Sequence, residues 1–210
     1  MRTETRTHTF KTFSELTEEN QLKIVEENRN MEVEHDWWDF VYADAIELGE
    51  MMGIEIQEIQ FSGFWSQGDG ARFRGFFKPK PDMREAILAY APPDEELHLI
   101  ADRLAAVQEE NGWLVECKIR FVHYNNCVHE YNTDFEFEPV GIDQVGDEVW
   151  LKESDEKEVI DCLRRLMRWI YSTLEKEYEY LTSDEHLLQV FSDYDNEYEV
   201  EIEDGEETLV

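Results

Sequence analysis

Hydrophobic residues recur along this chain with two different periods. A spacing of three and four residues is typical of a helix with one buried side, and a spacing of two is typical of a half-buried strand. The first spacing predicts helices over residues 14–28, 36–52, 84–90, 94–111, 154–181 and 185–191, with Ser14 or Thr17 as the first cap. The second predicts strands over residues 54–61, 71–77, 113–123, 128–138 and 197–202, the last as a strand or an extended arm.

Local signals define where several helices begin and end. Asp36 and Asp94 are residue types that cap helix N-termini, and Gly53 follows the second helix as a stop. The longest helix, over residues 154–181, has an apolar residue on one side at every turn. Residues 141–146 carry no period and are predicted to form a loop.

The predicted strands are arranged as two hairpins. In the strand over 54–61 the apolar residues change sides halfway, which predicts a β-bulge near Gln57–Glu58 or burial on both faces. The strand over 71–77 returns after a longer connection. The strands over 113–123 and 128–138 are separated by a short turn and form the second hairpin.

This order of elements predicts an α+β fold. We expect an antiparallel sheet built from hairpins and packed against several helices, including one long C-terminal helix. At 210 residues, a single domain with appendages is expected. We therefore divide the chain into a flexible N-terminus over residues 1–12, one α+β domain over 13–191 and an acidic C-terminal arm over 192–210.

The connection inside the first hairpin is the least ordinary segment. Residues 61–77 read FSGFWSQGDGARFRGFF, in which glycines and aromatic residues surround a few polar side chains. The loop Ser66-Gln67-Gly68-Asp69-Gly70 could form a small polar pocket from backbone amides and side chains, with Asp69 as an acid, a base or a ligand orienter. The candidate ligand-pocket residues are Trp65, Ser66, Gln67, Asp69, Arg72 and Arg74.

The same loop has a structural interpretation. Asp69-Gly70 is a turn-forming pair, and Ser66 and Gln67 can satisfy the backbone of the loop. The segment is not a P-loop, because no Gly-Lys-Ser/Thr follows, and it has too few acids for an EF-hand. Turn chemistry favours the structural interpretation.

His123 and His129 lie near the turn of the second hairpin and are candidate acid–base groups alongside Asp69. With Cys117 and Cys127 they could also be soft-metal ligands, but their spacing matches no zinc pattern. No serine or cysteine nucleophile signature accompanies them. We therefore expect no metal and no cofactor, and the sequence favours a binding protein over an enzyme.

The main basic island follows the glycine-rich loop directly. It comprises Arg72, Arg74, Lys78, Lys80 and Arg84. These side chains could hold a phosphate or an acidic patch. The alternative, which we favour, is that they pair with carboxylates of the same chain.

The net charge of −32 narrows the classes of partner. It argues against direct binding to nucleic acid or to an anionic membrane, and it favours a basic partner or a surface that imitates nucleic acid. Plain solubility and salt adaptation are alternative explanations. No stretch approaches a membrane span, no signal peptide is evident, and three cysteines form no disulfide framework, so we expect a cytosolic protein.

The C-terminal segment concentrates this charge, because no Lys or Arg occurs from Glu177 to the end of the chain. One interpretation is an arm that binds in a basic groove of a partner. The alternative is a solvated tail with no partner. The candidate partner-binding residues are Asp193, Asp195, Glu197, Glu199, Glu201 and Glu203.

Three stretches carry a resemblance to a known group of proteins. IQFSGFWSQGDGA, the preceding DWWDFVYADA and the later RWIYSTLEKEYEYLTSDE resemble small acidic proteins of bacteriophages, prophages and plasmids, some of them labelled antitoxin-like. The resemblance covers most of residues 13–191 and implies a mobile-element protein acting in a bacterial cytoplasm. After Ala71 that group would carry a cysteine and Glu-Gly, whereas Arg72-Phe73-Arg74-Gly75 stands here.

The sequence therefore leads to a functional hypothesis with two alternatives. The hypothesis is an acidic, mobile-element-encoded protein that inhibits a nucleic-acid-binding defence or toxin protein of its host, through imitation of nucleic acid. One alternative is an enzyme or small-ligand binder that uses the loop over Ser66–Gly70 with His123 or His129. The other is an antitoxin or a replication accessory protein. The sequence does not indicate an oligomeric state.

Overall fold

The computed structural model describes residues 9–122, 128–194, 196–203 and 206–210. The chain forms two compact units. We call residues 38–175 the central unit, and residues 1–37 together with 176–210 the terminal unit. These boundaries differ from the predicted division at residues 12 and 191, because both ends of the chain contribute to one compact unit.

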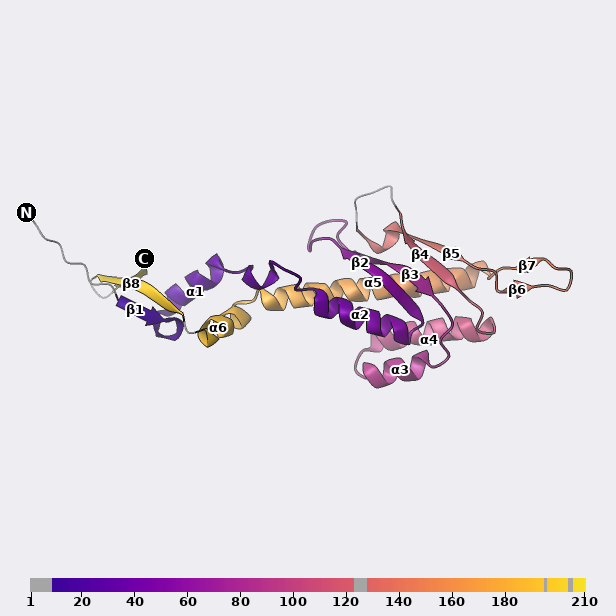
Figure 1. Ribbon diagram of the computed structural model, residues 1–210, viewed down its shortest axis with the longest axis horizontal. Helices are drawn as coiled ribbons and strands as arrows, with labels where there is room; N and C mark the ends of the chain where they lie inside the picture. The colour runs from indigo at the N-terminus through magenta and orange to yellow at the C-terminus, as the bar shows by residue number, and fades with distance from the viewer. Residues whose placement is uncertain (1–8, 123–127, 195, 204–205) are drawn as a thin grey trace, which may run out of the picture. The chain divides into compact units, whose positions relative to one another are not determined.

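The central unit contains a four-stranded antiparallel sheet with strand order β2-β3-β4-β5 (Figure 1). Its strands are β2 (Ile54–Phe61), β3 (Ala71–Phe77), β4 (Cys117–Phe121) and β5 (Thr133–Phe137). Each strand pairs with the next along the chain, so the sheet is built from hairpins as predicted. Helices lie on one face of this sheet, which confirms the α+β class.

The helices of the central unit bury its core against that face. They are α2 (Asp39–Met51), α3 (Met83–Tyr90), α4 (Glu95–Glu110) and α5 (Glu153–Leu181), whose last residues, 176–181, belong to the terminal unit. Asp94 caps α4 by accepting the Leu97 N–H at 3.0 Å, as predicted. The core side chains that are almost inaccessible to solvent include Phe73, Phe77, Ile119, Leu104, Leu163 and Leu166.

The predicted bulge in β2 is confirmed. The pairing register with β3 shifts between Ile56 and Glu58. At the same level Gly75 has φ +158°, and a Cβ atom there would lie 1.8 Å from the Glu55 carbonyl oxygen. Only glycine lets the two strands approach this closely.

Four details of the sequence prediction were wrong, and two of them concern where strands begin. The segment predicted as a strand over 113–123 begins at Trp113 with φ +60°, directly after Gly112 at φ +65°, and strand pairing starts only at Cys117. The Gln108 side-chain amide bonds both the N–H and the carbonyl of Val115, at 3.1 and 2.7 Å, and so replaces a strand partner there. In the second predicted strand, a 3₁₀ turn, η3 (Glu130–Asn132), precedes β5.

The other two corrections concern a loop and a cap. Residues 141–146 belong to a small hairpin of β6 (Gly141–Ile142) and β7 (Glu148–Val149), because Asp143 accepts N–H groups across the turn. Asp36 does not cap α2. It has φ +45°, and Trp38 occupies the N-cap position.

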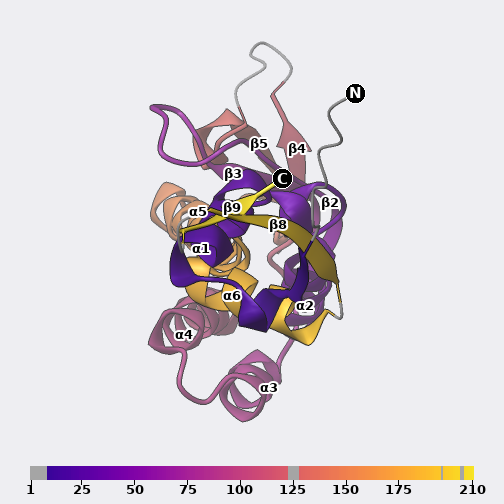
Figure 2. The same ribbon diagram turned by 90° about the vertical axis from the view of Figure 1, so that its left-hand side faces the viewer.

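The terminal unit also has an α+β architecture, with helices packed on a small sheet (Figure 2). Its sheet has the order β1-β8-β9 and is antiparallel. The elements are β1 (Thr9–Thr12), η1 (Phe13–Glu15), α1 (Glu18–Glu27), η2 (Met31–Val33), α6 (Asp184–Asp193), β8 (Glu197–Glu203) and β9 (Glu206–Leu209). The segment expected as an acidic arm therefore contains the central strand and one edge strand of a sheet.

Both helices of the terminal unit cover one face of that sheet. The buried cluster comprises Phe13, Leu16, Ile24, Val25, Leu187, Phe191 and Val200. Thr17 and Ser183 cap the two helices, each accepting a backbone N–H with its side chain, and Thr17 is one of the two residues predicted to cap the first helix. Among the helices of the described residues, none combines the length and the apolar character that crossing a membrane requires.

Candidate functional site

An aromatic cluster holds the glycine-rich loop of the central unit. The Phe61 ring lies 5.6 Å from Trp38 and 5.8 Å from Phe64, and Phe64 lies 5.5 Å from Tyr171, each measured between ring centroids. These contacts tie the loop to the start of α2 and to α5. Such ring pairs add stability beyond the area they bury, so the loop is anchored rather than free.

Hydrogen bonds inside the loop use the polar side chains that could have formed a pocket. The Asp69 carboxylate accepts the Ser66 N–H at 2.8 Å, and the Asp69 N–H donates to the Ser66 carbonyl at 3.1 Å. Burial and the neighbouring Asp69 carboxylate raise the pKa of the Tyr171 hydroxyl. That hydroxyl donates to the Gly63 carbonyl at 3.2 Å. Asp69 thus closes a turn, as the structural interpretation requires.

The C-terminal end of the loop lies against His129. A Cβ atom on Gly70 would be 3.0 Å from His129 Cδ2. Beside it, Ser62 Oγ accepts the Gly70 N–H at 3.0 Å and donates to the Val128 carbonyl at 3.2 Å. The loop and His129 are therefore neighbours, although the Asp69 carboxylate is committed to its own turn. His123 and Cys127 lie outside the described residues.

His129 contacts groups other than the loop. Its ring stacks on Tyr131 with centroids 5.3 Å apart, and its Nδ1 lies 2.9 Å from the Glu130 carboxylate. Glu130 is only 5% exposed and also pairs with Arg168 at 3.2 Å. His129 therefore belongs to a charged cluster next to α5.

The two arginines predicted to line the pocket are held by the sheet. Arg72 is buried, donates to the Gln60 side chain at 2.8 and 3.1 Å, and lies over the Phe121 ring at 4.4 Å. Arg74 pairs with Glu58. Trp65, with φ +68°, is 68% exposed, and Ser66 and Gln67 are also exposed. The predicted pocket residues thus divide between an exposed turn and the sheet.

The outer face of the sheet shows why the basic island does not form an anion site by itself. Cations stand on the two central strands and at their ends, and carboxylates stand on the two edge strands. The ion pairs are Lys78 with Glu55 at 3.0 Å, Arg74 with Glu58 at 2.7 Å, and Arg120 with Glu136. Arg84 pairs with Asp102 and Glu109 on α4. For Arg74, Lys78 and Arg84 the favoured alternative, pairing with carboxylates of the same chain, is confirmed.

The described cysteines are not reactive groups. Cys117 and Cys162 are buried, and burial raises the pKa of each thiol to about 12. A thiol with such a pKa is almost entirely protonated at neutral pH and is a poor nucleophile. Within the part of the chain that the structure describes, no three His, Cys, Asp or Glu side chains come together as a metal site would require.

Acidic residues are concentrated in the terminal unit. Residues 1–37 and 176–210 hold 22 of the 51 acids but only 6 of the 19 Lys and Arg, a net charge of −16 over 72 residues. On β8, Tyr198 and Val200 pack into the core, so Glu197, Glu199 and Glu201 share the opposite face.

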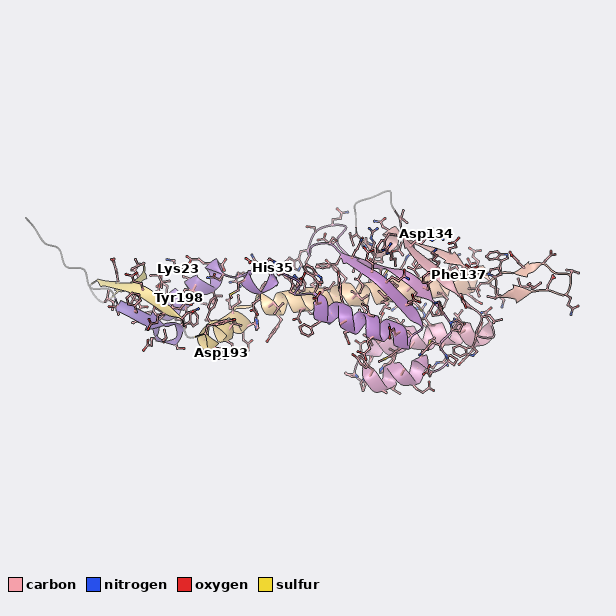
Figure 3. All side chains as sticks on the ribbon, viewed as in Figure 1. Lys23, His35, Asp134, Phe137, Asp193 and Tyr198 are labelled. Carbon is pink, nitrogen blue, oxygen red and sulfur yellow. The ribbon has the colours of Figure 1, made fainter. Side chains whose placement is uncertain are left out.

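The other predicted partner-binding residues are placed differently. Asp193 is exposed at the end of α6 and accepts hydrogen bonds from Gln189, and Figure 3 labels it together with Tyr198 of β8. Asp195 and the side chain of Glu203 lie outside the described part. One acid has an internal role: Lys11, with the Thr17 N–H and Asn20, lowers the pKa of Glu207 to about 2.

Sequence reasoning missed the pockets of the central unit, one of which gathers cations of α5. A cavity of 480 Å³ is lined by Glu130, Tyr131, Lys157, Ile160, Asp161, Arg164 and Arg168. The available signal was the spacing of Lys157, Arg164 and Arg168, seven and four residues apart on the predicted long helix. That spacing brings three cations to one side of the helix.

Comparison with known proteins connects the chain to a family without a known activity. A family described as a domain of unknown function (DUF8835) matches residues 37–184. No curated protein and no solved structure matches the chain.

Proposed function

We propose that this chain, which belongs to the DUF8835 family, binds a basic macromolecular partner through the acidic surface of its terminal unit. The observation that carries the proposal is the net charge of −16 on 72 residues. The central unit carries the same net charge on 138 residues, so the charge density of the terminal unit is almost twice as high. Excess charge of this kind repels itself and is relieved by a partner of opposite sign.

The acids stand on a folded scaffold. Glu197, Glu199 and Glu201 alternate along the central strand of a sheet, which spaces successive carboxylates by roughly 6.8 Å along the strand. A row of fixed negative charges suits a groove that normally holds a nucleic acid backbone. Because the strand is already ordered, binding costs less conformational entropy than it would for a flexible arm.

Such a protein would act as an inhibitor. By occupying the basic groove of a nucleic-acid-binding defence or toxin protein, it would exclude DNA or RNA from that groove. The resemblance to proteins of phages and plasmids supports a bacterial cytoplasm as the place of action. An antitoxin or a replication accessory protein would use the same acidic surface, and the identity of the partner separates these cases.

The test compares two triple variants that lose the same charge. One replaces Glu197, Glu199 and Glu201 by Gln on β8. The control replaces Glu95, Glu110 and Glu148 by Gln, all exposed residues of the central unit. Wild-type protein first captures partners from a bacterial lysate, and the dissociation constant of the main partner is then measured for each variant.

We expect the β8 variant to bind the partner roughly threefold to a hundredfold more weakly, since each exposed ion pair contributes about 0.2–1 kcal/mol. The control variant should bind as wild type does. Affinity should fall with added salt, and duplex DNA or RNA should compete for the same partner. Equal loss in both variants, or simultaneous binding of protein and nucleic acid, contradicts the proposal.

The alternative of a small-ligand site in the glycine-rich loop has less support. Asp69 bonds within its own turn, and the two arginines pair with sheet residues. We therefore propose no chemistry for this loop, and assign it the role of an anchored hairpin connection.

A further inference from the structure

Arg164, on α5 of the central unit, carries a charge that the chain does not neutralise. Its guanidinium carbon lies 4.9 Å from the centre of the Tyr131 ring and 5.5 Å from that of Phe135. Its Nε atom is buried and has no hydrogen-bond partner. Across the described residues, no carboxylate lies within ion-pair distance of this side chain.

This situation is unusual in a chain with 51 acids and 19 Lys and Arg. The neighbouring cations of the same region are paired: Lys157 with Glu153, Arg165 with Glu96 and Asp161, Arg168 with Glu130, and Arg103 with Glu158 and Asp161. A guanidinium stays charged at every physiological pH, and burying one of its N–H groups without an acceptor is unfavourable. The same side chain lines a cavity.

The surroundings of Arg164 form a pocket suited to a small ligand. The cavity measures 480 Å³, a volume typical of small-molecule sites, and Lys157 and Arg168 line it on the same side of α5. Tyr131 of η3, which is 64% exposed, also lines the cavity. Three cations and an aromatic side chain therefore border one cavity.

Two carboxylates also line the cavity, and both are already neutralised. Glu130 lies 3.2 Å from Arg168. Asp161 lies 2.8 Å from Arg103 and also pairs with Arg165. Their repulsion of an anion is reduced accordingly, and the charge of Arg164 remains uncompensated.

We propose that this cavity binds a phosphate monoester group of a small molecule, with Arg164 as its main contact. Lys157 and Arg168, which already pair with Glu153 and Glu130, flank this contact. Arginine matches phosphate through paired N–H donors, and a dianion makes use of more than one cation, which favours phosphate over a carboxylate. The site lies wholly within the central unit and is independent of the acidic surface proposed to bind a macromolecule.

The experiment titrates the full chain with inorganic phosphate at constant ionic strength, set with chloride. The ¹⁵N–¹H signal of the Arg164 Nε–H group, assigned by its loss in Arg164→Gln, reports directly on the site. We expect a saturable shift at phosphate concentrations below about 50 mM, and at least tenfold weaker binding of acetate. Glycerol 3-phosphate and adenosine monophosphate are titrated in the same way. Both carry a phosphate monoester, and they differ in the rest of the molecule.

Variants separate a binding role from a structural one. Arg164→Lys keeps the charge but loses the planar fork, and should weaken phosphate binding roughly tenfold. Lys157→Gln changes a mostly exposed side chain and should weaken it about threefold without affecting the fold. Arg120→Gln, on the sheet, should leave phosphate affinity unchanged and is the matched control.

Several results would overturn the proposal. One is a linear, non-saturating shift of the Arg164 signal with phosphate. Another is acetate that binds as tightly as phosphate. Loss of affinity in Arg120→Gln equal to that in Lys157→Gln would also refute the assignment, because it would indicate general attraction by cations. The proposal is supported if any of the three phosphate compounds binds saturably, and if Lys157→Gln weakens this binding while Arg120→Gln does not.

Discussion

Replacing Glu207 by Gln tests how the acidic C-terminal segment is held in place. The Glu207 carboxylate pairs with Lys11 of β1, accepts the Thr17 N–H at 3.0 Å and accepts from the Asn20 amide at 3.0 Å. Glutamine has nearly the same shape, and its Oε1 can still accept from the Thr17 N–H and the Asn20 amide. It loses the charge that Lys11 neutralises, so the change isolates the electrostatic part of the contact.

The expected loss of stability in Glu207→Gln follows from the pKa of Glu207. Its contacts, with Lys11 first, lower the pKa from the ordinary 4.5 to about 2. A shift of this size corresponds to about 3 kcal/mol of stabilisation of the folded state. The Lys11 side chain is 28% exposed, so solvent screens part of the interaction, and we expect a loss of roughly 2 kcal/mol at pH 7.

The pH dependence has a definite sign. A carboxylate with a lowered pKa in the folded state stabilises the protein fully above its unfolded pKa of 4.5, and this stabilisation is lost as the pH falls toward 2. The difference between wild type and Glu207→Gln should therefore be largest at pH 7 and less than half as large near pH 3. Urea unfolding at both values, on either side of the sequence pI of 4.3, measures it.

A matched control is Glu179→Gln, which removes an exposed acid of the terminal unit and should change stability by less than about 0.5 kcal/mol. If Glu207→Gln is as stable as wild type at pH 7, the carboxylate does not hold the segment. A stability difference that stays constant between pH 7 and pH 3 would show that shape, and not charge, is the cause.

Three further expectations concern the central unit. Gly75→Ala should lower the free energy of unfolding by more than about 3 kcal/mol in urea titrations, since its Cβ would meet backbone at 1.8 Å, whereas Gly141→Ala meets no atom within 4 Å and should be near neutral. Cys117 and Cys162 should resist alkylation at pH 8 in the folded protein and react after denaturation, as peptide mapping will show. Asp69→Ala should cost about 1 kcal/mol in thermal unfolding and Asp69→Asn less, because only the amide can still accept the turn N–H.

Local patterns predicted most of the central unit. The stripe of α5 and the change of side in β2 are properties of neighbouring residues, and both were confirmed. The prediction of a strand from Trp113 failed because a side chain from α4, Gln108, competes for the backbone of Val115. Such a contact between elements leaves no periodic trace in the sequence.

The candidate sites show the same limit. The polar residues of the glycine-rich loop invited a pocket, but Asp69 bonds three residues back along the chain. No sequence motif marks Arg164. Its importance depends on which of its neighbours are already paired, and that is decided by contacts with α4 and η3 that only the folded chain shows.

The pairing of β1 with β8 has a consequence for the order in which the chain becomes structured during translation. Residues 9–12 pair with residues 197–200, so this sheet cannot close until the ribosome has synthesised nearly two hundred further residues. Residues 38–175 are contiguous and can begin to fold earlier. The acidic surface is therefore completed last, and a nascent chain would reach its partner-binding form only after that late, long-range closure.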